Sequence, residues 1–322
     1  MDLHDPLFTS LTLLSDRSRW GCGLSPRSHT SVLKLGLFGT PIAHSLSPKL
    51  HEAAALSCGM KMKYRCFESS TITFHQQLIE AQNWKIHGAS VTAPIKKKAW
   101  DLCQHRTLSA ELIGAVNTLA WTEDGLVGHN TDVIGLLHSL IETVNLRQIE
   151  RAILIGNGGA ANASLLALLL LSERYRWDKL QIAARSSQQS GQLCERLTDW
   201  NASFSLATSH LIQPQLLSLK TLGQLKLSTP TLLISALPPL STHFWQDQLP
   251  KASAGSMIFD LNYGVDRCAS LESVASSFGY HYISGLGMLV EQGIEAFKWW
   301  SNRSPESRVV YSKMNGVEEQ RF

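Results

Sequence analysis

The segment RAILIGNGGAANASLLALLLL, residues 151–171, decides the fold class of the chain. Residues 151–155 are an apolar run of the strand type, and residues 162–171 are apolar enough for a buried helix. Between them, Gly156 to Ala161 fits the pattern G-x-G-x-x-[GA]. In that turn the first glycine permits a tight bend, the second lets a pyrophosphate approach the backbone, and the third small residue lets helix and strand pack. This order predicts the first unit of a doubly wound parallel sheet.

The same glycine turn favours a dinucleotide site over a purely structural turn. The N-terminus of the following helix would offer free N–H groups and a positive dipole end to phosphates. The next strand candidate, residues 181–184, is followed by Arg185 and Ser186. An NAD site usually has an acidic residue there, which bonds the ribose 2′-hydroxyl. An arginine instead makes charge-assisted bonds to a 2′-phosphate, and a serine adds a hydroxyl donor, so the sequence favours NADP.

Strand candidates also lie on both sides of this segment. They cover residues 33–39, 88–91, 115–121 and 126–129 before it, and residues 231–235 and 257–261 after it. The third and fourth are separated by Glu123-Asp124-Gly125, which suggests a hairpin. We therefore expect an α/β protein of two domains, an N-terminal one with a mixed sheet and a Rossmann-type one with a parallel sheet. A last apolar helix, at about residues 286–300, could pack on either domain.

Length and composition exclude several classes of protein. The 322 residues suffice for two domains, and 44% hydrophobic residues argue against disorder. A net charge of +3, with one dense basic run at residues 96–98, is too weak for a nucleic-acid surface. The six cysteines lack the paired spacing of a zinc site, so we expect no metal. The longest apolar run, residues 165–171, is too short to span a bilayer, and we expect a soluble cytoplasmic protein.

Several short blocks place polar side chains where loops should leave strands. Ser45 and Ser47 lie two residues apart, which puts both hydroxyls on one side of an extended segment. Ser47 would serve equally well as a helix N-cap before a proline. Lys96 follows Pro94 at the start of a helix, where the helix dipole disfavours a cation, and this placement hints at a use for the amine.

A lysine and an aspartate in one cleft would suit the oxidation of an alcohol. The hydroxyl must lose its proton as the hydride leaves, and in reverse the carbonyl oxygen must gain one. The ordinary lysine pKa of about 10.4 is high for this task. Desolvation would lower that pKa and a nearby carboxylate would raise it.

Taken together, the blocks resemble those of the shikimate dehydrogenase family, in the same order, from about residue 35 to residue 300. They are SLSP at 45–48, VTAPIK at 91–96, GAVNTL at 114–119, GHNTD at 128–132, GNGGAA at 156–161, NY at 262–263 and GLGMLVEQ at 285–292. The resemblance implies reversible NADPH-dependent reduction of 3-dehydroshikimate to shikimate, a step toward chorismate and the aromatic amino acids. It implies a small-molecule substrate and neither a nucleic-acid nor a membrane partner, and it leaves a homodimer open.

The resemblance also implies residue roles. Lys96 and Asp132 would form the catalytic pair, and Ser45 and Ser47 would hold the substrate carboxylate. The ring hydroxyls would be contacted by Thr92, Asn117, Tyr263 and Gln292. The NADP site would be lined by Gly156, Asn157, Gly158, Gly159, Ala160, Arg185, Ser186, Leu261, Gly285 and Met288. One departure lies beside the substrate block, where Ser90 stands in place of the family's usual asparagine.

By the same analogy the last helix returns to the first domain, and the active site lies in a cleft between the two domains. We expect an extension over residues 1–33 and a substrate domain over 34–132 plus 285–303. An NADP-binding domain would cover 133–284, and a frayed polar tail 304–322. The two-serine block resembles shikimate-preferring members. A quinate/shikimate dehydrogenase of broader specificity and a non-catalytic paralogue that binds a dinucleotide or metabolite are the alternatives.

Overall fold

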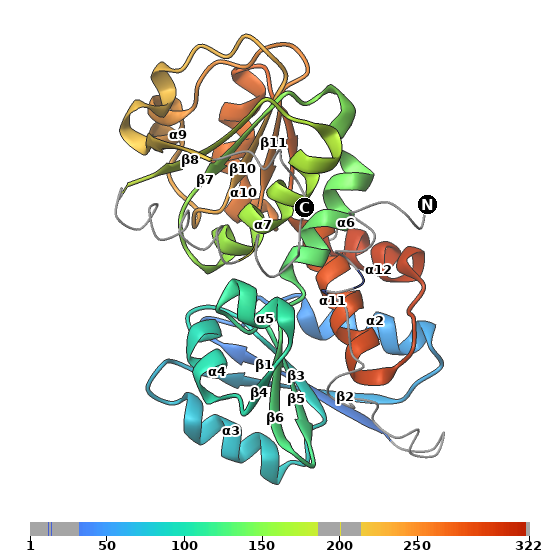
Figure 1. Ribbon diagram of the computed structural model, residues 1–322. Coiled ribbons are helices and arrows are strands. Elements are labelled where there is room, and N and C mark those ends of the chain that lie inside the picture. The colour runs from blue at the N-terminus through green and yellow to red at the C-terminus, as the bar shows by residue number, and fades with distance from the viewer. Residues whose placement is uncertain (1–11, 13, 15–31, 186–199, 201–213, 320–322) are drawn as a thin grey trace. The chain divides into compact units, whose positions relative to one another are not determined.

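The computed structural model describes residues 12, 14, 32–185, 200 and 214–319. The chain divides into two compact units (Figure 1). One, here the N-terminal unit, contains the described part of residues 12–135 together with residues 290–319, and the other, the central unit, is built mainly of residues 136–289. The boundaries fall inside helices α6 (Asp132–Thr143) and α11 (Leu286–Ser301). Among the described residues, no helix is both long and apolar enough to cross a membrane.

The N-terminal unit contains a six-stranded sheet in the order β2-β1-β3-β5-β6-β4. The strands are β1 (Leu33–Gly39), β2 (Met62–Glu68), β3 (Gly88–Val91), β4 (His105–Arg106), β5 (Thr118–Thr122) and β6 (Gly125–His129). β1 pairs in parallel with β2 and β3, whereas β5 runs antiparallel to β3 and β6. The expected mixed sheet and the hairpin at residues 123–125 are therefore confirmed.

Helices pack on both faces of this sheet. They are α2 (Ser47–Ser57), α3 (Phe74–Asn83), α4 (Lys96–Leu102), α5 (Leu108–Ile113), the C-terminal part of α11, and α12 (Ser307–Glu319). One apolar core joins Phe38 and Phe67 of the strands to Phe74 of α3 and to residues of α4 and α5. On the opposite face Gly88 meets Trp300 of α11, whose indole Nε1 donates to the Leu119 carbonyl at 2.8 Å.

Two expectations about the chain ends have different outcomes. The frayed tail predicted from residue 304 is wrong, because residues 307–319 form α12, which packs on α2 and buries Val310 and Met314. These two apolar positions lie four residues apart and so share one face of the helix. Packing of that face, rather than helix propensity, stabilises such a polar segment. The predicted extension over residues 1–33 lies almost wholly outside the described residues, although Leu14 is buried.

The central unit contains a six-stranded sheet in the order β12-β11-β10-β7-β8-β9, in which every described pairing is parallel. The strands are β7 (Arg151–Ile155), β8 (Lys179–Ala184), β9 (Gln215–Ser218), β10 (Thr231–Ser235), β11 (Met257–Asp260) and β12 (His281–Ile283), with helices α7 (Gly159–Tyr175), α9 (Thr242–Gln248) and α10 (Val265–Ser277). Counted from β7, this is the doubly wound order 3-2-1-4-5-6. It confirms the predicted Rossmann-type sheet. In sheets of this order, ligands bind outside the carboxyl ends of the strands where the order reverses, which here is between β7 and β10.

Candidate active site

Lys96 and Asp132, which are 36 residues apart, meet in the N-terminal unit. Lys96 is the first residue of α4 and Asp132 the first residue of α6. Lys96 Nζ donates to Asp132 Oδ2 at 2.7 Å, and the two side chains are 25% and 8% exposed. An ammonium group has three hydrogens to donate, so two remain for a ligand. The structure thus brings together the two residues that were predicted to handle the proton.

Asn117 holds the second oxygen of the same carboxylate. Its Nδ2 donates to Asp132 Oδ1 at 2.7 Å, and its Oδ1 accepts from the Thr131 backbone N–H at 2.9 Å. These two bonds fix which end of the amide faces Asp132. With Oδ1 bound to Asn117 and Oδ2 bound to Lys96, the carboxylate has one orientation, and it aims the amine in turn.

Gln292, 175 residues from Asn117, joins this network from α11. Its Oε1 accepts from Thr131 Oγ1 at 3.3 Å and from Asn117 Nδ2 at 3.5 Å. The close approach depends on Gly135 of α6, because a Cβ at that position would lie 2.6 Å from Gln292 Cβ. Asn117, Asp132 and Gln292 therefore form one cluster with Lys96, and the family resemblance implies a role at the substrate for each of the four.

Asn130 supports this cluster and was not singled out from the sequence. Its Oδ1 accepts from the Asp132 N–H at 2.9 Å, and its Nδ2 donates to the Ala115 carbonyl at 3.0 Å. The side chain thereby ties the start of α6 to the loop that presents Asn117. The GHNTD block could have indicated this role, because the amide of Asn130, if buried between a strand and a helix, needs hydrogen-bond partners.

Ser45 and Ser47 lie at the N-terminus of α2. Ser45 Oγ accepts from the Ser47 N–H and donates to Ser47 Oγ, both at 3.2 Å. The N-cap position belongs to Leu46, and no side chain caps this helix, so the N-cap interpretation of Ser47 is wrong. The Ser47 hydroxyl, on a side chain that is buried, is therefore not consumed by capping. Thr92 begins the turn into α4, where its N–H donates to the Phe38 carbonyl at 2.9 Å.

The glycine turn of the central unit has the form that a bound pyrophosphate needs. Gly156 has φ +124°, and a Cβ there would lie 3.2 Å from the Ala236 carbonyl oxygen. Gly158 and Gly159 are exposed, and a Cβ on either would meet nothing within 4 Å. Open space therefore lies over the N-terminus of α7, where backbone N–H groups favour an anion. Ala161, the third small residue, is fully buried.

The other predicted cofactor residues flank neighbouring strands of the same unit. Arg185 follows β8 and is exposed, whereas Ser186 lies outside the described residues. Leu261 follows β11, and Gly285 comes so close that a Cβ on it would lie 2.6 Å from the Leu261 carbonyl oxygen. The Gly285 N–H donates to the Asn262 carbonyl at 2.8 Å. Met288, on the first turn of α11, is 8% exposed.

Asp260, at the end of β11, anchors this turn and was also missed from the sequence. Its Oδ1 accepts from the Asn262 N–H at 3.1 Å, and its Oδ2 accepts from Tyr282 Oη at 3.1 Å. Burial raises the pKa of Asp260, and the hydrogen bonds from Asn262 offset part of that shift. Tyr263 follows directly in this turn and belongs to the central unit.

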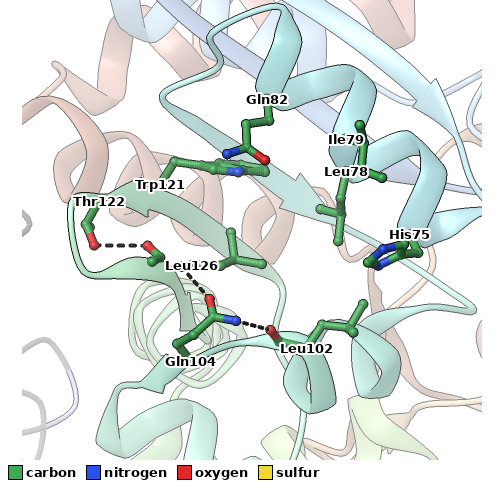
Figure 2. A pocket seen from close by; sticks show the side chains of 10 residues that line it. His75, Leu78, Ile79, Gln82, Leu102, Gln104, Trp121, Thr122 and Leu126 are labelled. Atoms are coloured by element: carbon green, nitrogen blue, oxygen red, sulfur yellow. Dashed lines mark hydrogen bonds between the residues drawn. The ribbon is translucent and has the colours of Figure 1, made fainter.

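A separate hollow of about 290 Å³ lies on the N-terminal unit (Figure 2). It is lined by residues of α3, the end of α4 and the β5–β6 hairpin: His75, Leu78, Ile79, Gln82, Leu102, Gln104, Trp121, Thr122, Gly125 and Leu126. None of the predicted site residues lines it. The described residues also contain no group of three or more His, Cys, Asp or Glu side chains suited to a metal ion.

Comparisons with known proteins agree with these sites. Residues 37–119 match the family model of the shikimate dehydrogenase substrate binding domain, and residues 285–314 match that of the shikimate 5′-dehydrogenase C-terminal domain. The chain is similar to a shikimate dehydrogenase (NADP(+)) of Xylella fastidiosa strain M12, with 32% identity over 88% of this chain and 96% of the relative. A protein of the same name from Shewanella woodyi is 32% identical over 85% of this chain and 93% of its own.

Among solved structures, the chain resembles shikimate 5-dehydrogenase from Thermus thermophilus in complex with NADP(H) and shikimate. The TM-score is 0.68 at 26% identity, and the match covers 89% of this chain and all of that one. The two-unit fold, the Lys96–Asp132 cluster, the glycine turn and these relatives agree with one another. The chain belongs to the shikimate dehydrogenase family.

Proposed function

We propose that the protein is an NADP-dependent shikimate dehydrogenase, which interconverts 3-dehydroshikimate and shikimate. The observation that carries the proposal is the Lys96–Asp132 pair, joined at 2.7 Å and held from its other side by Asn117. The sequence similarity to proteins named for this activity, over 88% of the chain in the Xylella relative, supports the same conclusion.

The chemistry follows from the hydrogens that this cluster can move. Oxidation of the ring alcohol removes a hydride from carbon and a proton from oxygen. A bound nicotinamide would supply the hydride chemistry, as the acceptor NADP in oxidation and as the donor NADPH in reduction. Lys96 Nζ, aimed by Asp132, would take the hydroxyl proton in oxidation as the neutral amine, and as the ammonium it would donate a proton to the carbonyl oxygen in reduction. Because both carboxylate oxygens are bound, Asp132 keeps the amine in position throughout.

The remaining side chains would fix the substrate. Ser45 and Ser47, at the amino end of α2, present hydroxyls where backbone N–H groups also favour a carboxylate. Asn117, Gln292 and Thr92 would offer donors and acceptors to ring hydroxyls, and Tyr263 keeps its predicted role as a further contact. Preference for shikimate over quinate is part of the proposal, and rates measured with both acids would test it.

The turn after β7 would hold the NADP pyrophosphate, and the backbone there fits it. Gly158 and Gly159 leave the helix end uncovered, and Arg185 follows the adjacent strand as an exposed cation. A guanidinium in that place suits the ribose 2′-phosphate. A cytoplasmic location fits the chemistry of the cysteines, since Cys58, Cys66 and Cys103 are free thiols, as expected in a reducing compartment.

The test is spectrophotometric, with purified protein, both acids and both nucleotides. NADP reduction should follow the addition of shikimate and be much slower with quinate or with NAD. Lys96→Ala should lower kcat by about 10²-fold or more, as expected for loss of a positioned acid–base group, with a smaller change in KM.

Lys97→Ala is the matched control, because Lys97 lies next in the chain but pairs on the surface with Asp101 and is 61% exposed. It should retain wild-type kcat. If Lys96→Ala keeps the wild-type kcat and only its KM for shikimate rises, Lys96 binds substrate without moving the proton. Equal losses in both variants would remove the catalytic role.

A further inference from the structure

Four polar side chains converge beneath the N-terminus of α2 on one face of the sheet. Ser47 and His51 lie four residues apart on α2 and so share a face of that helix. Tyr64 of β2 pairs with Leu35 of β1, and Ser90 of β3 pairs with Leu37. Since residues 35 and 37 of a strand point to the same side, the side chains of Tyr64 and Ser90 face the same way.

His51 is fully buried and neutral. Its ring stacks on Tyr64 with 5.5 Å between centroids, and its Nε2 lies 3.3 Å from Ser90 Oγ. Its Nδ1 has no hydrogen-bond partner among the described residues. Burial lowers the pKa of His51 to about 3. An unsatisfied lone pair costs less than an unsatisfied buried N–H, so the hydrogen belongs on Nε2, where Ser90 accepts it.

Tyr64 lies between Ser90 and Ser47. Its hydroxyl is buried and makes no well-aligned hydrogen bond with a described residue. Burial raises the pKa of Tyr64, while hydrogen bonding to the hydroxyls of Ser90 and Ser47 lowers it by less. A buried hydroxyl without a partner is costly, so a hydrogen bond with Ser90 or Ser47 would stabilise the Tyr64 phenol.

We infer that His51, Ser90 and Tyr64 are positioning residues that form a one-way hydrogen-bond chain ending on Ser47 and orient its hydroxyl toward the substrate carboxylate. The inference rests on the proposed function. His51 Nε2–H donates to Ser90 Oγ, the Ser90 hydroxyl donates to Tyr64 Oη, and the Tyr64 hydroxyl donates to Ser47 Oγ. Ser47 then has its own hydrogen to give to the carboxylate.

This series of hydrogen bonds supplies Ser47 with a donor other than Ser45. In this structure Ser45 Oγ donates to Ser47 Oγ at 3.2 Å. Once Ser45 turns its hydrogen to the carboxylate, the Ser47 oxygen loses that donor, and Tyr64 replaces it. Hydrogen bonds that all run in one direction polarise each other, so the last one, to the anion, is strengthened. No charge is added, because every member is neutral.

Tyr64→Phe is the first test, because it keeps the ring and its stacking on His51. The KM for shikimate should rise about tenfold, as for a weakened bond to a charged group, with kcat within about twofold and the KM for NADP unchanged. With the methyl ester of shikimate, which lacks the anion, wild type and variant should have the same KM. The matched control is Tyr280→Phe, which removes a buried hydroxyl that donates to the Pro250 carbonyl at 3.0 Å, and it should leave the KM for shikimate unchanged.

The outcomes separate this inference from the proposed function. A wild-type protein that neither binds nor oxidises shikimate would overturn both. An active wild type with an unchanged KM in Tyr64→Phe, or an equal loss with acid and ester, would overturn the inference alone. The KM for shikimate should rise in His51→Leu. In His51→Gln, which keeps a side-chain N–H, it should stay close to the wild-type value. If His51→Leu does not fold, ¹⁵N NMR of the wild-type ring still decides, since protonation of Nδ1 instead of Nε2 contradicts the direction of the chain.

Discussion

The Lys96–Asp132 pair differs from a simple ion pair because Asn117 also binds the carboxylate. Its Nδ2 lies 2.7 Å from Asp132 Oδ1. Asn117→Asp has nearly the same shape but would place a second carboxylate against the first. Like charges at that distance raise the pKa of one carboxyl group. The acidic limb of the kcat/KM profile should therefore move to higher pH, and a pH series from about 5 to about 9 measures it. A profile identical to that of the wild type would mean that Asn117 does not act on Asp132.

Asp260 makes the stability of the central unit depend on pH. Burial raises its pKa above the ordinary 3.8. The stability that this carboxyl contributes is complete below its unfolded pKa and is lost as pH rises through the folded pKa, where a buried carboxylate forms. The free energy of unfolding of wild type relative to Asp260→Asn should thus be greatest below about pH 4 and decrease as the pH rises from there. Urea unfolding at several pH values tests this, and a constant difference would contradict it.

Among the secondary-structure elements, α11 depends on one glycine of the neighbouring strand. A Cβ at Gly88 would lie 2.3 Å from Trp300 Nε1, the atom that donates to the Leu119 carbonyl. Gly88→Ala should therefore displace the indole and destabilise the protein by about 1–3 kcal/mol, as overpacking does. Gly159→Ala is the control, because a Cβ there meets nothing within 4 Å. Denaturant unfolding of both variants compares them, and equal stabilities would show that α11 tolerates the shift.

The elements that the sequence predicts well are those with a local signature. Residues 152–155 of β7 and 165–171 of α7 are apolar and buried, and the glycine turn lies between the two elements. β2 was missed because it is an edge strand, MKYRCFE, in which only Phe67 is fully buried. α12 was missed for a related reason, since its stability comes from packing on α2 and not from its own polar sequence.

Across the whole chain, the site assembles groups that lie far apart in sequence. Patterning could suggest that Lys96 and Asp132 have chemical roles, but their pairing followed only from the family resemblance. Neither source pointed to His51, Tyr64 or Asp260, whose importance lies in burial and in hydrogen bonds that form only after the chain folds. Side chains that position other groups have no sequence pattern of their own. Before the fold is known, they cannot be told apart from other polar residues that face the core.

Each unit has its own sheet and helices, so each proposed ligand should stabilise the protein through a different unit. A ligand at one hundred times its dissociation constant adds about 2.7 kcal/mol to the free energy of unfolding. NADP should do so through the turn at residues 156–160 and through Arg185, and shikimate through the Lys96 cluster. Arg185→Ala should then reduce the stabilisation by NADP while leaving that by NAD and by shikimate unchanged, because only NADP carries the 2′-phosphate. Thermal unfolding with each ligand alone measures these effects. If NAD and NADP stabilise the variant less than the wild type by equal amounts, Arg185 supports the turn and does not bind the 2′-phosphate.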